Sequence, residues 1–147
     1  MDMKTVLNDI LTAYGLLLDF DAASDGTLWS IEIRPKGKLH RTEGATAYSR
    51  PLIIAREGPV LRLAHYTVST YDIDYDPFVE FDMSGSDWPV ISIYRFHTGH
   101  QCFDPNGAEQ DQAREFVKEW ADGLVERGYC DASHGVVVGM GRGKAKL

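Results

Sequence analysis

Two segments near the ends of the chain carry apolar residues at helical spacing. Over residues 3–14 the apolar positions recur every three or four residues, with Asp2 placed to cap the start and Gly15 placed at the end. Over residues 107–127 an apolar stripe faces a charged side, and Gly128 follows as a stop signal. The pattern predicts two helices, each with one face that needs cover.

Between these helices the pattern changes to the alternation of strands. Trp29, Ile31 and Ile33 alternate with polar residues as in a half-buried strand. Four more strand-like runs follow between turn-forming residues, near 51–57, 59–68, 78–83 and 88–96. Residues 36–50 are polar without periodicity and are expected to form a surface loop. Because the connections are short, we expect antiparallel pairing.

The sequence therefore predicts an α+β fold, in which an antiparallel sheet of about five strands is flanked by an N-terminal and a C-terminal helix. Residues 1–134 are expected to form a single compact domain, and residues 135–147 a flexible, basic, Gly-rich tail. Ten residues on the apolar faces are expected in the core: Trp29, Ile31, Ile33, Ile54, Leu63, Phe81, Ile93, Phe116, Trp120 and Leu124.

The chain is acidic, with a formal net charge of −7. From Gly135 onward it holds three bases and no acid, so residues 1–134 carry −10. Such a body repels nucleic acid and attracts basic protein surfaces, although surplus acid can also serve solubility alone. The two cysteines are too few for a disulfide scaffold, no leader pattern opens the chain, and the apolar runs are short, so we expect a cytoplasmic protein that does not contact membranes.

Residues 72–83 are the most distinctive part of the sequence, because acidic and apolar residues alternate there. The acids of one parity are Asp72, Asp74, Asp76, Glu80 and Asp82. In a strand, residues of one parity lie about 6.6 Å apart, close to twice the ~3.4 Å rise per phosphate of a DNA strand, so the row can imitate a phosphate backbone. Tyr71 and Tyr75 are candidate aromatic anchors of the same surface. Pro77 is expected to bend the row, and an ordinary solvated sheet face is the alternative.

Two alternative chemistries remain open at this stage. His65, within a strand, could meet Asp76 or Glu80 across a hairpin and act as the base of a small hydrolase, or it could form a structural hydrogen bond. A metal-dependent version would use nitrogen and sulfur donors near one turn: His97, His100 and Cys102. The chain holds no compact second ligand pair, no nucleophile elbow and no phosphate loop, and we expect no cofactor.

Three segments carry a resemblance to a known family: Pro51-Leu52-Ile53-Ile54, Leu63-Ala64-His65-Tyr66 and Asp76-Pro77-Phe78-Val79-Glu80-Phe81. Their order resembles a family of small uncharacterised α+β domains, of unknown function, from bacteria, plasmids and phages. The likeness runs from about Asp25 to Phe103. The chain departs from the family pattern at Phe78-Val79 and in its long C-terminal helix. The resemblance implies a compact domain on mobile DNA and supplies no catalytic residues.

Together these observations favour a non-enzymatic acidic binding protein. Its expected partner is a basic, nucleic-acid-handling protein, such as a defence complex blocked by a phage or plasmid inhibitor of the anti-CRISPR or anti-restriction kind. The hydrolase is the main alternative. A third hypothesis is a structural module that pairs with its own copy through a sheet edge or a helix, and the sequence leaves the oligomeric state open.

Overall fold

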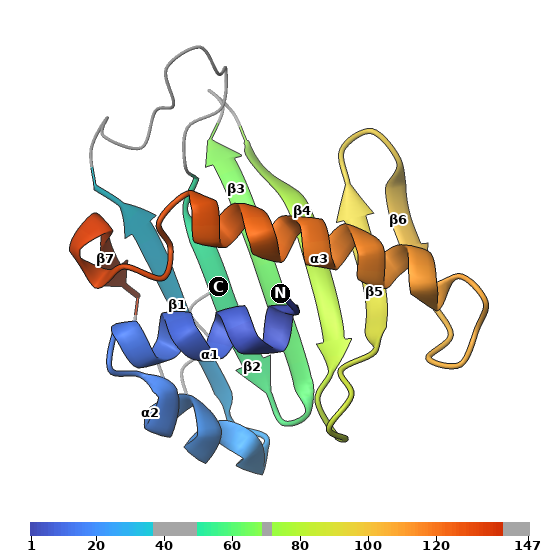
Figure 1. The fold of residues 1–147 in the computed structure, drawn as a ribbon, viewed down its shortest axis with the longest axis horizontal. Helices are drawn as coiled ribbons and strands as arrows, with labels where there is room; N and C mark the ends of the chain where they lie inside the picture. Colours follow the sequence, from blue (N-terminus) through green and yellow to red (C-terminus); the bar gives the residue numbers. More distant parts are fainter. Residues whose placement is uncertain (37–49, 69–71, 140–147) are drawn as a thin grey trace.

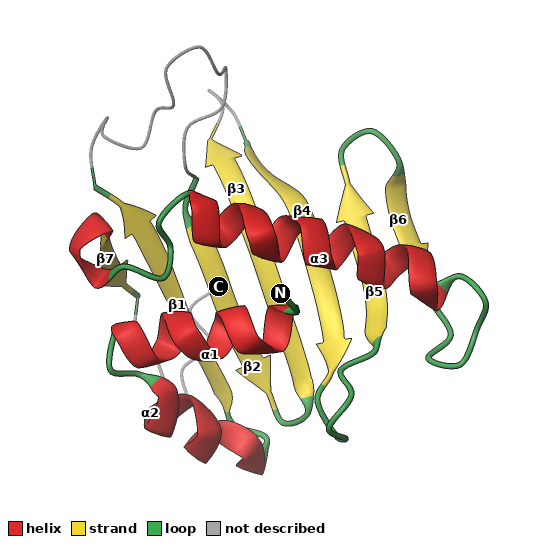
Figure 2. Cartoon of the chain, in the orientation of Figure 1, coloured by secondary structure: helices red, strands yellow, loops and turns green. Residues whose placement is uncertain are grey.

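The structure is a computed structural model that describes residues 1–36, 50–68 and 72–139. Within these ranges, a seven-stranded antiparallel sheet has the order β6-β5-β4-β3-β2-β1-β7. Two helices, α1 and α3, lie side by side across one of its faces (Figures 1 and 2). The strands are β1 (Leu28–Pro35), β2 (Leu52–Glu57), β3 (Val60–Val68), β4 (Ile73–Asp82), β5 (Val90–Arg95), β6 (Gly99–Cys102) and β7 (Gly135–Val138). The α+β fold predicted from the sequence is confirmed.

The N-terminal helical region begins as the sequence predicts and continues further. In α1 (Met3–Ala13), the Asp2 side chain accepts a hydrogen bond from the Thr5 backbone N–H at 2.8 Å, which caps the first turn. The helix α2 (Leu17–Ala22), which the sequence pattern does not indicate, is short and buries Phe20 against Trp29 in an edge-to-face contact. Neither helix, nor any other in the described chain, is long and apolar enough to cross a membrane.

The C-terminal helix α3 (Gln110–Glu126) ends at the predicted stop. Gly128 adopts a φ of 84°, which L side chains rarely adopt, and its N–H bonds to Val125 O at 3.1 Å. The next N–H, from Tyr129, reaches back to Leu124 O at 3.1 Å, which completes a Schellman motif. This turn sends the chain back under the helix and buries Tyr129.

The core lies between the two helices and the sheet, as the apolar faces require. Nine of the ten expected core residues are buried, among them Trp29 and Leu124. Phe116, the tenth, is half-buried and packs against the edge of the core. Trp29, Ile31 and Ile33 all face the helices while their neighbours point the other way, as strand alternation demands.

The sheet has two more strands than expected, one at each edge. The strand β6 pairs with β5, and β7 pairs with β1 in the register Glu32↔Val138 to Pro35↔Gly135. The prediction of a tail from Gly135 onward is therefore wrong for 135–138, because these residues supply the outer partner of β1. The rest of that expected tail, from 140, and most of the expected loop, 37–49, lie outside the described residues.

A β-bulge interrupts the pairing of β3 with β4. Ala64 lies opposite Phe78, whereas Tyr66 lies opposite Tyr75, so two residues of β4 face the single residue His65. The extra residue reverses the facing of everything on one side of the bulge. Tyr75 and Phe78 consequently share the uncovered face of the sheet, with ring centroids 5.9 Å apart.

Candidate functional site

The bulge divides the predicted row of carboxylates between the two faces of the sheet. Glu80 and Asp82 lie beyond it on the uncovered face. Glu80 is held there by Arg62 Nε at 2.9 Å and by the Ser92 hydroxyl at 2.8 Å. Burial opposes ionisation of Glu80, but these two hydrogen bonds and the nearby charge of Arg62 together keep its pKa below the ordinary value. The Glu80 carboxylate is thus bound largely by side chains of the protein itself.

The other three acids do not lie on the same face as Glu80 and Asp82. Asp76 lies at the bulge, and Asp74 pairs with Thr67 on the helix side of the sheet. Asp72 precedes the strand and accepts a hydrogen bond from the Ile73 N–H at 2.8 Å. The expectation that the five acids share one face of the strand is therefore wrong, because the bulge reverses which face the residues before it point to. A binding role for the individual acids stays a prediction.

Of the two predicted aromatic anchors, the structure describes one. Tyr75 is half-buried on the uncovered face, where its ring lies 6.1 Å from that of Tyr66. Tyr71 lies outside the described residues. Tyr75 is therefore part of an aromatic group on the open sheet face rather than a neighbour of all five acids.

The expected base and its carboxylates do not form a hydrogen-bonded set. His65 faces the helices, and its Nδ1 lies 3.1 Å from the Pro51 carbonyl oxygen. Glu80 points from the opposite face, so the bulge excludes the pair His65–Glu80. Asp76 comes near His65 at the lining of one pocket, without a hydrogen bond between the two side chains. The pairing of His65 with a carboxylate across the hairpin is corrected to a hydrogen bond with backbone.

The expected metal donors are also separated. His97 lies in the turn before β6, while His100 and Cys102 are exposed on that strand opposite Tyr94 and Ser92. Within the described residues no group of three His, Cys, Asp or Glu side chains is arranged to hold a metal ion. The grouping of His97, His100 and Cys102 around zinc is wrong, because the strand directs His100 and Cys102 to the face of the sheet that the helices do not cover.

The structure brings together a pocket that the sequence did not predict. It has a volume of about 370 Å³ and lies between α3, with the turn that follows it, and parts of β3, β4 and β5. The bulge places Asp76 and Pro77 in its wall, and the Schellman turn of α3 brings Arg127 and Tyr129 to it. We call it the basic pocket, after the three arginines that line it: Arg50, Arg95 and Arg127.

The arginines of the basic pocket are held in different ways. Arg50 donates through Nη1 to the Asp76 backbone oxygen at 3.3 Å. Arg95 lies over the Phe116 ring at 4.5 Å, and its Nε is 4.0 Å from an Asp76 carboxylate oxygen. The backbone N–H of Arg127 donates to the Gly123 carbonyl oxygen at 3.0 Å, but its guanidinium has no ion-pair or hydrogen-bond partner among the described residues. The pocket lining also includes two carboxylates, Asp76 and Glu119. The lining therefore has a net positive charge, although the protein as a whole is acidic.

The inner wall of the basic pocket is aromatic. The His65 ring lies 5.4 Å from Trp120 and 5.5 Å from Tyr129, and the Tyr129 hydroxyl donates to the Arg50 carbonyl oxygen. Burial lowers the pKa of His65 to about 4, despite its hydrogen bond to Pro51, and nearby Arg127 and Arg50 lower it further. His65 is therefore neutral at pH 7, with the proton on Nδ1 and a lone pair on Nε2.

Known proteins offer no guide to this site. Comparisons with protein-family models, with curated protein sequences and with solved structures returned no match. The family resemblance drawn from the sequence stays an expectation.

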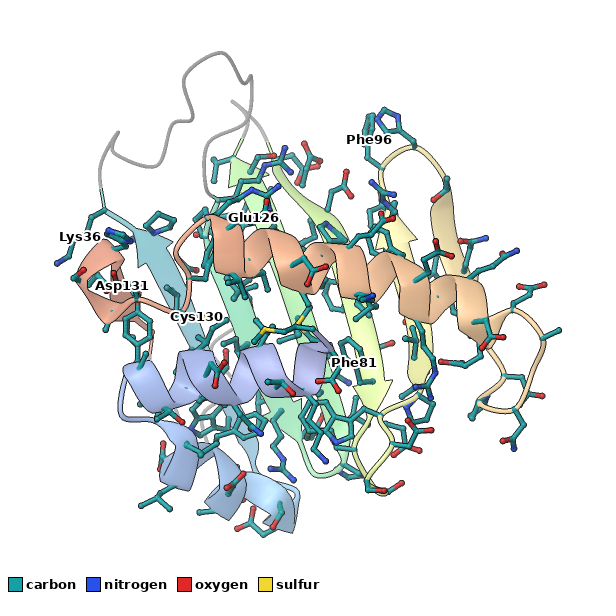
Figure 3. The ribbon with its side chains drawn as sticks, in the orientation of Figure 1. Lys36, Phe81, Phe96, Glu126, Cys130 and Asp131 are labelled. Carbon is teal, nitrogen blue, oxygen red and sulfur yellow. The ribbon has the colours of Figure 1, made fainter. Side chains whose placement is uncertain are left out.

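A second charged feature covers the outside of the helical layer. The helices α1, α2 and α3 together carry eight acids and three bases. Five of the acids lie on α3, all exposed: Asp111, Glu115, Glu119, Asp122 and Glu126. Figure 3 shows Glu126 at the last turn of α3, away from Phe96 at the tip of the β5–β6 turn. The acids of α3 are thus all exposed, whereas of the acids within β4 only Asp74 is exposed.

Proposed function

We propose that this protein is a non-enzymatic binding protein that docks a basic protein surface on the outer face of α3. The observation that supports it is the spacing of acids along that helix. Asp111, Glu115 and Glu119 follow one another four residues apart, and so do Asp122 and Glu126. Residues four apart are neighbours on a helix, so each successive pair places two negative charges side by side.

The like-charge pairs of acids oppose the stability of α3, and Arg114 and Lys118 on the same helix offset part of that cost. Each like-charge pair four residues apart costs about 0.2–0.5 kcal/mol. The last turn of α3 holds Glu126 and no basic residue, although the helix macrodipole favours cations there. Asp122 binds the N-terminal ammonium at 3.0 Å, whereas Glu115 and Glu126 have no ion-pair partner among the described residues. A cationic partner would remove this repulsion on binding.

The partner class that best fits this surface is a basic nucleic-acid-binding protein. Residues four apart rise by about 6 Å along a helix, which is close to twice the ~3.4 Å spacing of phosphates along a DNA strand. The net charge of −7 supplies long-range attraction to such a surface and speeds association. The likeness to domains from plasmids and phages agrees with an inhibitor of a defence complex.

The test removes charge from α3 while leaving its packing intact. In Glu115→Gln/Glu126→Gln, both side chains are exposed and neither lines the basic pocket. We expect slower association with the partner and a weaker dependence of the association rate on salt. At the same time α3 should become more stable, by about 0.5–2 kcal/mol, because like-charge repulsion is relieved. A merely structural role of these acids does not produce opposite changes in binding and stability.

The matched control is Asp9→Asn/Asp21→Asn, which removes the same charge from exposed positions of α1 and α2. The partner is first captured from host lysate with the unaltered protein, then purified, and its association is followed by stopped-flow fluorescence at several salt concentrations. Equal association rates for the α3 variant and the control variant would reject α3 as the contact surface. A captured partner without a basic surface would reject the proposed class.

A further inference from the structure

We propose that the basic pocket binds a small organic anion, a phosphate or a carboxylate attached to an aromatic ring. This site shares Glu119 with the acidic face of α3, but the proposal does not depend on the function proposed for that face. It combines two features: a cluster of guanidinium groups at its mouth and an aromatic wall with unused hydrogen-bonding atoms inside.

The arginines supply the anion-binding part. The Arg127 guanidinium has no partner among the described residues, and Arg95 keeps 45% of its side chain exposed while its guanidinium rests on the Phe116 ring. Stacking on an aromatic ring fixes the plane of a guanidinium before a ligand arrives, so less conformational entropy is lost on binding. A guanidinium then offers paired N–H donors that match two oxygens of a phosphate or a carboxylate.

The wall supplies the ring-binding part. Trp120 is 7% exposed, and its indole Nε1 is buried without any hydrogen-bond partner in the described structure. His65 is also 7% exposed, and with Nδ1 bonded to Pro51 its Nε2 has no protein partner among the described residues. Among the described residues, Trp120 Nε1 is the buried side-chain polar atom that lacks a partner. Such an atom costs about 1–3 kcal/mol, so a ligand or water that reaches it would complete its bonding. The rings of Trp120 and His65, with that of Tyr129, form a surface on which a flat ring can pack.

The size and charge of the pocket limit the ligand further. A volume of about 370 Å³ lies at the lower end of the roughly 300–1,000 Å³ range of small-molecule sites. Asp76 and Glu119 offset two of the three arginine charges, so the pocket suits one anionic group rather than a polyanion. The acids along α3 border the same region and repel a nucleic acid strand. The ligand is therefore a small metabolite-sized anion.

The direct test is titration of the purified full chain with phenyl phosphate, followed by ¹⁵N-resolved NMR of the three tryptophan indole groups. Inorganic phosphate and phenol, which represent the two halves of phenyl phosphate, are titrated separately for comparison. We expect phenyl phosphate to bind at least tenfold more tightly than either half, and to shift the indole signal that Trp120→Phe removes. Binding no tighter than that of inorganic phosphate, or a shift confined to another tryptophan, would overturn the proposal.

Two arginine variants identify the contact. Arg127→Gln should weaken phenyl phosphate binding about tenfold, and Arg127→Lys should restore part of it by restoring the charge. Arg114→Gln is the matched control, because Arg114 lies on the same helix but is bound to Asp87 at 2.9 Å outside the pocket. Equal affinity in the Arg127 and Arg114 variants, both verified as folded by circular dichroism, would contradict the assignment. The variant Glu115→Gln/Glu126→Gln should keep phenyl phosphate binding, which separates this test from that of the α3 surface.

Discussion

The side chain of Gln110 takes the place of a missing strand at the start of β5. It is 5% exposed and lies at the first residue of α3. Its Oε1 accepts from the Val90 N–H at 2.7 Å, and its Nε2 donates to the Val90 carbonyl oxygen at 3.0 Å. Nε2 also donates to the Asp104 carbonyl oxygen at 3.2 Å. One amide group thus satisfies both backbone groups of a residue that is itself 1% exposed.

We predict that Gln110→Met lowers the free energy of unfolding by about 2–4 kcal/mol. Methionine has a similar shape, so the change removes hydrogen bonds without opening a large cavity. It leaves the N–H and the C=O of Val90 buried without partners, and each such group costs about 1–3 kcal/mol. The added apolar burial recovers part of that loss. Domains of this size have roughly 5–15 kcal/mol of stability in total, so the effect is large.

Urea denaturation followed by circular dichroism measures the change, and an unaltered m-value shows that the same surface is exposed on unfolding. Amide hydrogen exchange should show the greatest loss of protection at Val90. A second variant, Gln110→Glu, adds a pH dependence, because the introduced carboxyl can donate to the Val90 carbonyl only when protonated. Its deficit relative to the unaltered protein should therefore be smaller at pH 4 than at pH 8.

A loss below about 0.5 kcal/mol in Gln110→Met would refute the role of Gln110, since surface substitutions have effects of that size. A full loss with unchanged exchange at Val90 would show that the stability resides elsewhere at the start of α3.

Three further predictions follow from buried contacts. The pKa of His65 is near its ordinary value of 6.5 in the unfolded state but only about 4 in the folded state, so its contribution to the free energy of unfolding is complete above pH 6.5 and falls, by up to about 3 kcal/mol, as the pH drops through this interval. The variant His65→Gln should flatten the profile of urea midpoints against pH, and an unchanged profile contradicts this. A Cβ on Gly135 would overlap the Tyr14 hydroxyl, so Gly135→Ala should cost about 1–3 kcal/mol and Tyr14→Phe should restore part of it in thermal denaturation; equal losses in both backgrounds would exclude that overlap. The Trp29 indole N–H donates to Asp19 at 2.6 Å, so Asp19→Ala should destabilise by about 1–3 kcal/mol, with Asp21→Asn as a neutral control.

The elements that the sequence predicts well are those whose own residues determine their form. The stripe of α3, its stop at Gly128 and the alternation around Trp29 depend on local periodicity and on one glycine with positive φ. The strand β7 depends instead on a partner at the other end of the chain. Its three successive valines show no alternation, so only the free edge of β1 defines them as a strand.

The bulge and the basic pocket could not be predicted for a related reason. The parity of Asp76 relative to Glu80 depends on the register between β3 and β4, which residues 72–83 alone do not define. Arg50, Arg95 and Arg127 lie in three distant segments, and each alone is an ordinary surface cation. Gly128 was the available signal, because a Schellman turn implies that Tyr129 packs back beneath α3.

The place of β7 in the sheet has a consequence for the synthesis of the chain. The strand β1 leaves the ribosome well before its outer neighbour, which is formed by residues 135–138. At bacterial or eukaryotic elongation rates the gap is on the order of ten seconds, during which one side of β1 has unpaired backbone groups. Nascent chains are therefore most vulnerable to strand-to-strand association between copies before translation reaches Val138, and truncation ahead of Gly135 would make that vulnerability permanent.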